Sequence, residues 1–340
     1  MSEKSYLDLK SGVWDAKKCS GCGACVAVCP ADALSFAEGE MVACPKSNGY
    51  CKQATDNVPC GACYAVCPRT GSQPDETLGT YLDLLSAKAA FEIPHRQSGG
   101  AVTAILANAL DEGLIDAVVT VTEDPWTLKP SSAVITKSEV LVRQAGSRYS
   151  WWVPLLAALK EAVVTRKYTN IAVVGVPCVV QAIARIRSGE NDLLYPYANA
   201  IRLVVGLFCT ETFDHAALVY GKLEKKYKLA PHEIKKLDIK GKLDITKQDN
   251  THLTVPLAEL DDTIRPGCRI CTDFSSLYAD ISAGAVGSPA GATTLIVRNG
   301  TGKGFVESAI RNGKLTVVAG TDTALIEKLA AAKIRKNSSK

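Results

Sequence analysis

Residues 19–30 read CSGCGACVAVCP, and this stretch decides the fold of the N-terminal part of the chain. Its four cysteines are spaced C-x2-C-x2-C-x3-C and are followed directly by Pro30, which is the run that binds a [4Fe–4S] cluster. The short spacings let one tight loop direct three thiolates at one cluster, and its glycines let the backbone approach the cluster closely. In such a run the fourth cysteine usually binds the other cluster of a pair, so the pattern predicts a second motif.

The second motif is CGACYAVCP at 60–68, which repeats CGACVAVCP at 22–30. Two copies of one loop-and-turn unit predict a bacterial-type ferredoxin domain of α+β class with two [4Fe–4S] clusters, over residues 1–75. The alternatives are a disulfide framework and a zinc site. The sequence shows no secretory signal peptide, which argues against disulfides. Zinc sites typically use two spaced cysteine pairs rather than a repeated CxxxCP.

One ligand of the second cluster does not stand at its regular position, which is occupied by Asn57. The missing thiolate must come from the preceding loop, which offers Cys44 and Cys51. We favour Cys51, because it is nearer and follows a glycine-containing turn. The other cysteine would then be a buried free thiol. The predicted ligands are Cys19, Cys22, Cys25 and Cys67 for the first cluster and Cys29, Cys51, Cys60 and Cys63 for the second.

The composition limits the class of protein. The chain has 340 residues, 47% of them hydrophobic and 22% charged, which is enough for a sizeable core and about two domains. A net charge of +4 is too small to indicate a nucleic-acid partner, although it leaves room for an anionic ligand. The 13 cysteines predict cofactor ligands in a reducing cytosol. No apolar run reaches the ~18 residues of a membrane span, so we expect partner subunits to provide any membrane attachment.

The remainder of the chain alternates between strand-like and helix-like segments. Residues 76–95 are polar and turn-rich and are predicted to be a connector. Beyond it, apolar strands at 116–122, 171–175 and 201–209 alternate with helical patterns, which predicts an α/β domain at 96–340 with a mixed, largely parallel sheet. Ser98 is the expected N-cap of the first helix. Residues 234–257 are predicted to form hairpins, and the basic tail with Lys333 and Lys336 is expected to fray.

Four further cysteines lie in the α/β domain. Cys178 and Cys209 each follow a predicted strand, and Cys268 and Cys271 form a CxxC pair. Because the carboxyl ends of parallel strands meet at one edge of a sheet, these cysteines are predicted to converge there. Four thiolates suit a third [4Fe–4S] cluster. Zinc and a redox-active dithiol at the CxxC pair remain alternatives from the spacing alone.

Three glycine-containing turns are candidates for a dinucleotide. Ser98-Gly99-Gly100 precedes a helix, which is either a phosphate-binding arrangement or a simple N-cap. In Gly146–Tyr149, Arg148 could pair with a diphosphate. Residues 284–288 form the third turn, and no GxGxxG follows a strand. The turns therefore permit a dinucleotide without identifying it.

Several stretches are similar to the coenzyme F420 hydrogenase/dehydrogenase beta-subunit family, and the similarity covers nearly the whole chain. With its N-terminal cluster motifs, the chain resembles in particular the electron-input subunits of the F420H2 dehydrogenases of methanogenic archaea, which are membrane-bound proton pumps akin to respiratory complex I. The stretches are QSGGAVTA at 97–104, AGSRY at 145–149, GVPCVVQA at 175–182, GLFCTE at 206–211, and CRICTDF with ADISAGAVGS within 268–288.

The resemblance implies an FAD in the α/β domain, coenzyme F420 as the substrate that docks against it, and a [4Fe–4S] cluster nearby. It implies that Cys178, Cys209, Cys268 and Cys271 hold this cluster. It also implies that Lys129 contacts the flavin or the substrate. The FAD contacts implied by the matching motifs are Ser98, Gly99, Gly100, Thr103, Ser147, Arg148 and Tyr149.

The expected activity is oxidation of reduced F420 by hydride transfer to FAD, after which single electrons pass through three clusters to a membrane-bound complex-I-like dehydrogenase or a soluble ferredoxin. The protein would then lie on the cytoplasmic side of the membrane. No catalytic side chain is required, although His95 and Arg96 adjoin the glycine turn. One alternative is a module of an F420-linked hydrogenase, formate dehydrogenase or sulfite reductase, working in either direction. The other is a flavin-free electron-transfer adaptor.

Overall fold

The computed structural model describes residues 4–37, 44–146, 152–239 and 241–338 of the 340-residue chain. Its N-terminal unit contains the cysteine repeat. Each copy of the repeat contains a one-turn helix, and the residue before that helix, Gly23 or Gly61, has a positive φ that favours glycine. The elements of this unit are α1 (Tyr6–Leu9), η1 (Lys10–Trp14), α2 (Ala24–Ala27), β1 (Leu34–Ser35), β2 (Lys46–Ser47), α3 (Lys52–Asp56) and α4 (Ala62–Ala65).

The second unit is built on an eight-stranded sheet with the order β13-β3-β12-β11-β7-β6-β4-β5. The four central strands β11, β7, β6 and β4 are parallel, whereas the pairs on both sides of them are antiparallel. The sheet is therefore mixed, and "largely parallel" holds for its centre alone. Its strands are β3 (Asp83–Ala89), β4 (Ala117–Glu123), β5 (Pro130–Ile135), β6 (Ile171–Gly175), β7 (Ile201–Leu207), β11 (Ile281–Gly284), β12 (Thr293–Val297) and β13 (Leu315–Val318).

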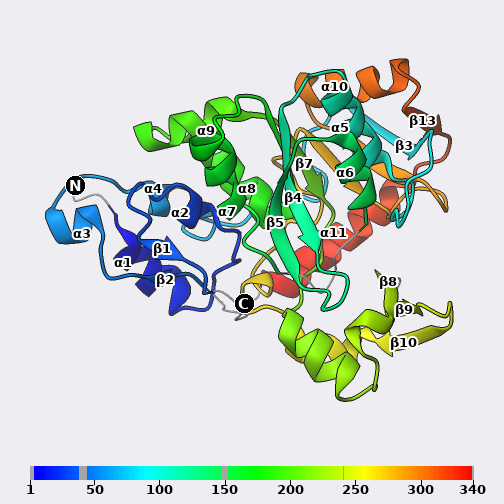
Figure 1. The fold of residues 1–340 in the computed structure, drawn as a ribbon, viewed down its shortest axis with the longest axis horizontal. Helices are drawn as coiled ribbons and strands as arrows, with labels where there is room; N and C mark the ends of the chain where they lie inside the picture. Colours follow the sequence, from blue (N-terminus) through cyan, green and yellow to red (C-terminus); the bar gives the residue numbers. More distant parts are fainter. Residues whose placement is uncertain (1–3, 38–43, 147–151, 240, 339–340) are drawn as a thin grey trace.

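Helices cover both faces of this sheet (Figure 1). Alternate residues of β6 show why: Ile171 and Val173 pack with one set of helices, and Ala172 and Val174 pack with the other. The first face is covered by α7 (Ala157–Lys160), η2 (Glu161–Thr165), α8 (Pro177–Ser188), η3 (Asp192–Leu194), α9 (Tyr195–Ala200) and, further along, α11 (Thr323–Asn337). The second face is covered by α5 (Ala101–Asp111), α6 (Ser138–Arg143) and α10 (Gly300–Arg311).

A strand lies within the range that was predicted to be a connector. Residues 83–89 form β3, which pairs with β12 on one side and β13 on the other. Its burial pattern is irregular rather than alternating, and three of its residues are Ser, Lys and Asp, so it lacks the usual sequence signal of a strand. Tertiary pairing with two strands that lie about 200 residues later overrides this weak local preference.

A smaller three-stranded antiparallel sheet confirms the hairpins predicted for 234–257. It has its own buried cluster, which includes Phe213, Leu243 and Val255. The β4–β5 hairpin reaches this unit, since His215 Nε2 bonds the carbonyl of Thr127 at 3.0 Å. Its elements are η4 (Ala216–Glu224), η5 (Pro231–Glu233), β8 (Ile234–Ile239), β9 (Lys242–Lys247), β10 (His252–Pro256) and η6 (Leu257–Thr263), followed by η7 (Pro266–Cys268).

The N-terminal unit docks on the helices of the first sheet face, and Figure 1 shows it beside α7, α8 and α9. The α/β unit supplies the donors, and backbone carbonyls of the cysteine repeat accept. Tyr197 Oη donates to Ala27 O at 2.6 Å, and Arg185 Nε donates to Ala65 O at 2.7 Å. Buried residues of α2 and α4 share one core cluster with α7 and α8. The two units therefore form one packed body.

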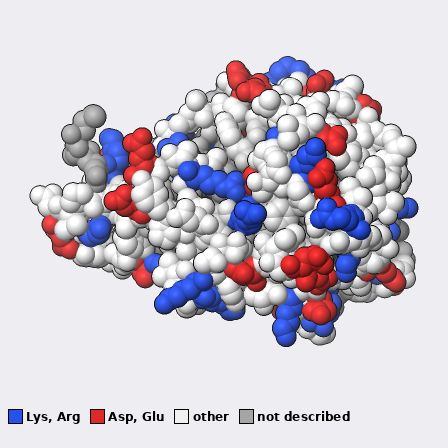
Figure 2. All heavy atoms as spheres, turned by 90° about the horizontal axis from the view of Figure 1, so that it is seen from above, with Lys and Arg blue, Asp and Glu red and all other residues white. Residues whose placement is uncertain are grey.

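Charges of both signs are interspersed over the face in Figure 2, in keeping with the small net charge of +4. In the part of the chain that the structure describes, no helix is both long and apolar enough to span a membrane.

Candidate iron–sulfur and flavin sites

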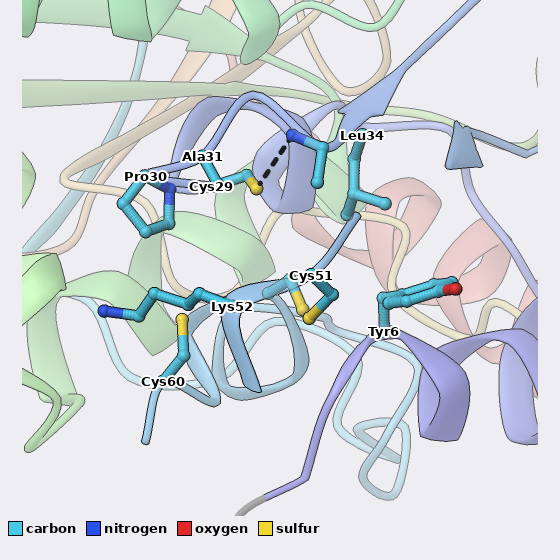
Figure 3. Close-up of a pocket in the computed structure, with 10 residues that line it drawn as sticks. Tyr6, Cys29, Pro30, Ala31, Leu34, Cys51, Lys52 and Cys60 are labelled. Atoms are coloured by element: carbon cyan, nitrogen blue, oxygen red, sulfur yellow. Dashed lines mark hydrogen bonds between the residues drawn. The ribbon is translucent and has the colours of Figure 1, made fainter. Parts of the chain in front are cut away.

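The eight predicted ligands of the ferredoxin-type unit surround two separate cavities. One cavity is lined by Cys19, Cys22, Cys25 and Cys67, and the other by Cys29, Cys51, Cys60 and Cys63 (Figure 3). The other lining residues are mostly apolar, and each cavity combines cysteines from both parts of the repeat region, as the crosswise pattern of two-cluster ferredoxins requires. Among the described residues, no three His, Cys, Asp or Glu side chains converge as they do around a single metal ion. The donor sets fit cubane clusters better than zinc.

Cys51 and Cys44 lie on different sides of this unit. Cys51 is the residue just before α3, and it faces the second cavity with Cys29 and Cys60 (Figure 3). Cys44 instead lies near the first set, where it interacts electrostatically with Cys19 and Asp15. Asn57, in the regular ligand position, ends α3 with a φ of 60°. Helix α3 thus separates Asn57 from Cys51, and it is Cys51 that lines the second cavity.

The third group of cysteines comes together at the carboxyl edge of the sheet. Cys178 lies in the first turn of α8 after β6, Cys209 follows β7, and Cys268 ends η7. Cys209 interacts electrostatically with the other three, including Cys271. The backbone N–H of Thr212 points at Cys268 Sγ, 3.4 Å away, which is the type of contact that stabilises a coordinated thiolate.

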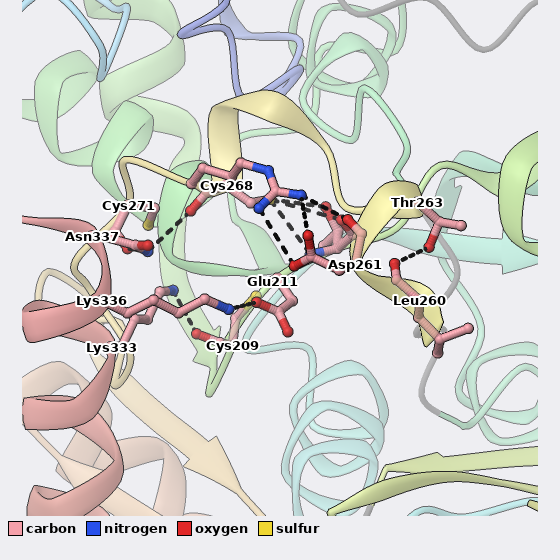
Figure 4. Close-up of polar contacts among 12 residues, drawn as sticks. Cys209, Glu211, Leu260, Asp261, Thr263, Cys268, Cys271, Lys333, Lys336 and Asn337 are labelled. Atoms are coloured by element: carbon pink, nitrogen blue, oxygen red, sulfur yellow. Dashed lines mark hydrogen bonds and ion pairs between the residues drawn. The ribbon is translucent and has the colours of Figure 1, made fainter. Parts of the chain in front are cut away.

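The C-terminal helix α11 holds this third site, which corrects the expectation of a frayed tail. The side chain of Lys333 is buried, and its Nζ donates to the carbonyls of Cys209 and Asp273, at 2.6 and 2.7 Å. Asn337 Nδ2 donates to the carbonyls of Cys268 and Cys271, at 3.2 and 2.7 Å (Figure 4). One helix therefore contacts the backbone of three of the four cysteines.

Two arginines lie between the third site and the first cavity. Arg69 follows Cys67-Pro68 directly, is buried, and interacts electrostatically with Cys271 and Cys178. Arg265 is buried and stacks on Trp152, with its guanidinium carbon 4.2 Å from the ring centroid. Trp152 in turn donates from Nε1 to Gly21 O, in the first cluster loop. Neither arginine was predicted from the sequence to belong to a site. Arg69 could have been noticed because it directly follows the Cys67-Pro68 pair of the second motif.

Burial and nearby charge act in opposite directions on the thiols of the third site. Burial raises the pKa of Cys178 to about 12. Burial also acts to raise the pKa of Cys271, but the ammonium of Lys333 and the guanidinium of Arg69 outweigh it, so that this pKa is lowered. The surroundings therefore favour the thiolate more at Cys271 than at Cys178.

The three sites lie in a row. Cys178 of the third site interacts electrostatically with Cys22 of the first cavity. Gly267, next to Cys268, packs so tightly against Cys19 that a Cβ would collide with the Cys19 backbone. The second cavity is lined by Cys51 and Lys52 at the start of α3, and α3 lies at the end of the molecule that is farthest from the sheet (Figure 1). The row therefore runs from the sheet edge to the outer end of the ferredoxin-type unit.

Among the predicted flavin residues that the structure describes, the Ser98–Gly100 turn lies at the same edge of the sheet as Cys178 and Cys209, beside the end of β3 and the start of β12. Ser98 is not the N-cap of α5, since Gly100, with a φ of 70°, takes that position. The amides of Gly99 and Gly100 already bond Thr293 Oγ1 and the Gln97 carbonyl. The donors left at this helix N-terminus are those of its first turn, which includes Thr103, and Gly100 has no side chain to cap them.

Close packing accounts for the glycine at position 99. A Cβ there would lie 2.5 Å from Ala87 O and 2.7 Å from Thr293 N, so the contact with β3 and β12 requires glycine. Lys129 is exposed at the tip of the β4–β5 hairpin, at the carboxyl end of β4. Ser147, Arg148 and Tyr149 lie outside the described residues.

Three segments of the chain match models of known protein families. A 4Fe-4S binding domain model matches residues 13–35. The models for the N-terminal and C-terminal parts of the coenzyme F420 hydrogenase/dehydrogenase beta subunit match residues 84–160 and 168–323. The chain thus has a ferredoxin domain followed by a mixed α/β domain.

The relatives are F420-linked where their names assign a function. An uncharacterized protein of Methanocaldococcus jannaschii is 43% identical, covering 97% of each chain. A subunit of the F(420)H(2) dehydrogenase of Methanosarcina mazei is 30% identical, covering 85% of this chain and 81% of its own. A chain of the F420-reducing [NiFe] hydrogenase complex from Methanosarcina barkeri superposes with a TM-score of 0.73 at 31% identity, covering 78% of this chain and 92% of that one. Other relatives include a coenzyme F420-dependent sulfite reductase. On these grounds the chain belongs to the coenzyme F420 hydrogenase/dehydrogenase beta-subunit family.

Proposed function

We propose that this protein oxidises reduced coenzyme F420 and delivers the electrons one at a time, through three [4Fe–4S] clusters, to partner subunits of a membrane-bound F420H2 dehydrogenase. The observation that carries the proposal is the row of three four-cysteine groups that begins at the flavin-type edge of the sheet. Three clusters in such a row would carry single electrons from a two-electron centre at the sheet edge to the surface at the outer end of the ferredoxin domain.

FAD, bound at the carboxyl edge of the sheet, would supply the conversion of hydride chemistry into single-electron chemistry. The chain's residues fit that group in two respects. The first turn of α5 offers uncapped amides and the positive end of an eleven-residue helix to a phosphate. Lys129, exposed on the hairpin at the same edge, can bind an anionic group of the flavin or the substrate.

The proposed ligands follow the three groups. Cys19, Cys22, Cys25 and Cys67 hold the first cluster, and Cys29, Cys51, Cys60 and Cys63 hold the second. Cys178, Cys209, Cys268 and Cys271 hold the third, which lies next to the flavin edge. The second cluster is then the exit, since its cavity is at the end of the unit that carries α3.

Anaerobic reconstitution with FAD followed by addition of F420H2 tests the hydride step. The flavin absorbance should bleach, and it should also bleach in Cys178→Ser, because that change affects electron exit rather than hydride uptake. Retained flavin absorbance in both proteins would contradict the hydride step, whereas failure of the protein to bind FAD would favour a flavin-free electron-transfer adaptor.

The same module could serve an F420-linked hydrogenase, formate dehydrogenase or sulfite reductase, or could reduce F420 rather than oxidise it. Purification of the native assembly decides among these partners. A complex-I-like set of membrane subunits is the expected result, and a nickel, molybdenum or sirohaem subunit in their place would assign the module to one of the other enzymes.

A further inference from the structure

The third site contains two buried cations, Lys333 and Arg69, that form no ion pair with a carboxylate of the described residues. The side chain of Lys333 is 6% exposed, and both hydrogen bonds from its Nζ go to neutral backbone carbonyls. Arg69 is 7% exposed, and the oxygens that it bonds, those of Gln73, Gln181 and the Gly267 carbonyl, are uncharged. Its guanidinium also bonds the sulfur of Cys271. Burying an unpaired charge is strongly unfavourable unless an anion compensates it.

The nearby carboxylate of Asp273 attracts the Lys333 ammonium electrostatically, but in the described part of the chain it forms no ion pair with Lys333 or Arg69. Asp273 is fully buried, but its oxygens accept from Gln181 Nε2 and from the backbone N–H groups of Ser276 and Leu277. In the described part of the chain, neither Lys333 nor Arg69 has an ion pair within 4 Å. The single negative charge of Asp273, whose oxygens accept hydrogen bonds from other groups, cannot balance the two positive charges of Lys333 and Arg69.

The arginine also has an unused donor. Among the described residues, Arg69 Nε is buried without a hydrogen-bond partner. The group that both cations face is the set of cysteines: Cys268 and Cys271 interact electrostatically with Lys333 and with Arg69. Four thiolates around an iron–sulfur core carry the net negative charge that the protein part of the site lacks.

The two cations come from outside the segments that carry these cysteines. Arg69 belongs to the ferredoxin domain, two residues after a ligand of the first cavity. Lys333 belongs to α11, whereas the match to the C-terminal part of the beta subunit ends at residue 323, where α11 begins. The charge balance of the third site therefore depends on both ends of the chain.

We propose that Lys333 and Arg69 set the reduction potential of the third cluster, an inference that rests on the cluster assigned under the proposed function. Reduction adds one electron to the cluster, without making or breaking a bond, and raises its negative charge by one. Two fixed positive charges in a dry site stabilise that added charge and raise the potential, because Coulomb attraction is strong at low dielectric. The cluster next to the flavin thus becomes a better acceptor. Both residues are positioning residues that act through the cluster.

The test is an anaerobic redox titration of the full-length chain with dithionite, followed by electron paramagnetic resonance. Comparison with Cys178→Ser identifies the signal of the third cluster. In Lys333→Met we expect the reduction equilibrium of that cluster to fall at least tenfold, which is about 59 mV toward negative potential for a one-electron couple. Arg69→Gln should shift it in the same direction. Lys333→Arg should stay near the wild-type potential.

The matched control is Lys336→Met, on the same helix, since Lys336 is about half exposed and pairs with Glu211. It should leave the potential unchanged. An intact third cluster with wild-type potential in Lys333→Met would overturn the inference. If Lys333→Met loses the cluster, Lys333→Arg decides: retention supports the role of charge, and loss there too overturns it. A wild-type chain without the third signal would refute the assigned cluster itself, which is a separate result.

Discussion

Gly267 packs directly against the backbone of Cys19, with no side-chain atoms between the two residues. The third cysteine site and the first cysteine loop are therefore in direct backbone contact. The φ of Gly267 is not positive, so the position requires glycine for space rather than for backbone conformation. This contact joins the ferredoxin domain to the α/β domain at the point where an electron would pass between them.

The first prediction concerns this contact. Gly267→Ala should force the two units apart and destabilise the protein by about 1–3 kcal/mol, the usual cost of overpacking. It should also make the first cluster lose iron faster in air. Gly304→Ala is the control, because a Cβ there meets open space. Thermal unfolding and iron release measure both effects, and equal behaviour of the two variants would show that the contact is loose.

The second prediction separates the two candidate ligands of the second cluster. Cys51 lines the second cavity, whereas Cys44 lies near Cys19 and Asp15. Cys51→Ser should therefore lower the iron content by about one cubane, that is about four irons, and Cys44→Ser should leave it unchanged. The opposite pattern would assign the ligand to Cys44.

The third prediction tests the docking of the ferredoxin domain through one hydrogen bond. Tyr197→Phe removes the donor to Ala27 O and leaves a buried carbonyl without its partner, at a cost of about 1–3 kcal/mol. Tyr195→Phe, two residues earlier in α9, is the control, since Tyr195 is 47% exposed. Denaturant unfolding gives both values. A cost at Tyr197 no larger than at Tyr195 would mean that this bond contributes little to docking.

The fourth prediction is a pH dependence of stability. His215 is 2% exposed, and burial lowers its pKa below the ordinary value. The folded protein therefore keeps it neutral, while the unfolded chain protonates it below about pH 6.5, so stability is lost as the pH falls through that value.

Thermal unfolding at pH 7.5 and 5.5 measures this loss of stability. The loss should be smaller in His215→Gln than in the wild type, and unchanged in His252→Gln, whose histidine is exposed. An identical loss in His215→Gln and the wild type would show that other groups account for it.

The sequence was most informative where chemistry fixes spacing. The cysteine repeat predicted both four-cysteine groups, because cubane geometry leaves little freedom in the loop, and Cys51 lines the second cavity, while its role as a ligand stays a prediction. It was least informative where tertiary contacts decide. Nothing local in residues 83–89 marks a strand between β12 and β13, and nothing in a basic tail marks Lys333 as buried. The N-cap is Gly100 rather than Ser98, next to Gly99, whose close packing against β3 and β12 no local pattern marks.

The most direct test of the central claim is whether F420H2 reduces iron–sulfur clusters in this chain, and does so through a flavin. We predict that F420H2 produces cluster signals in electron paramagnetic resonance from the FAD-loaded protein, which holds about twelve irons in three cubanes. The flavin-stripped protein should give none until FAD is restored. Cluster signals of equal size and rate without flavin, or a chain with four or fewer irons and no flavin binding, would contradict the account.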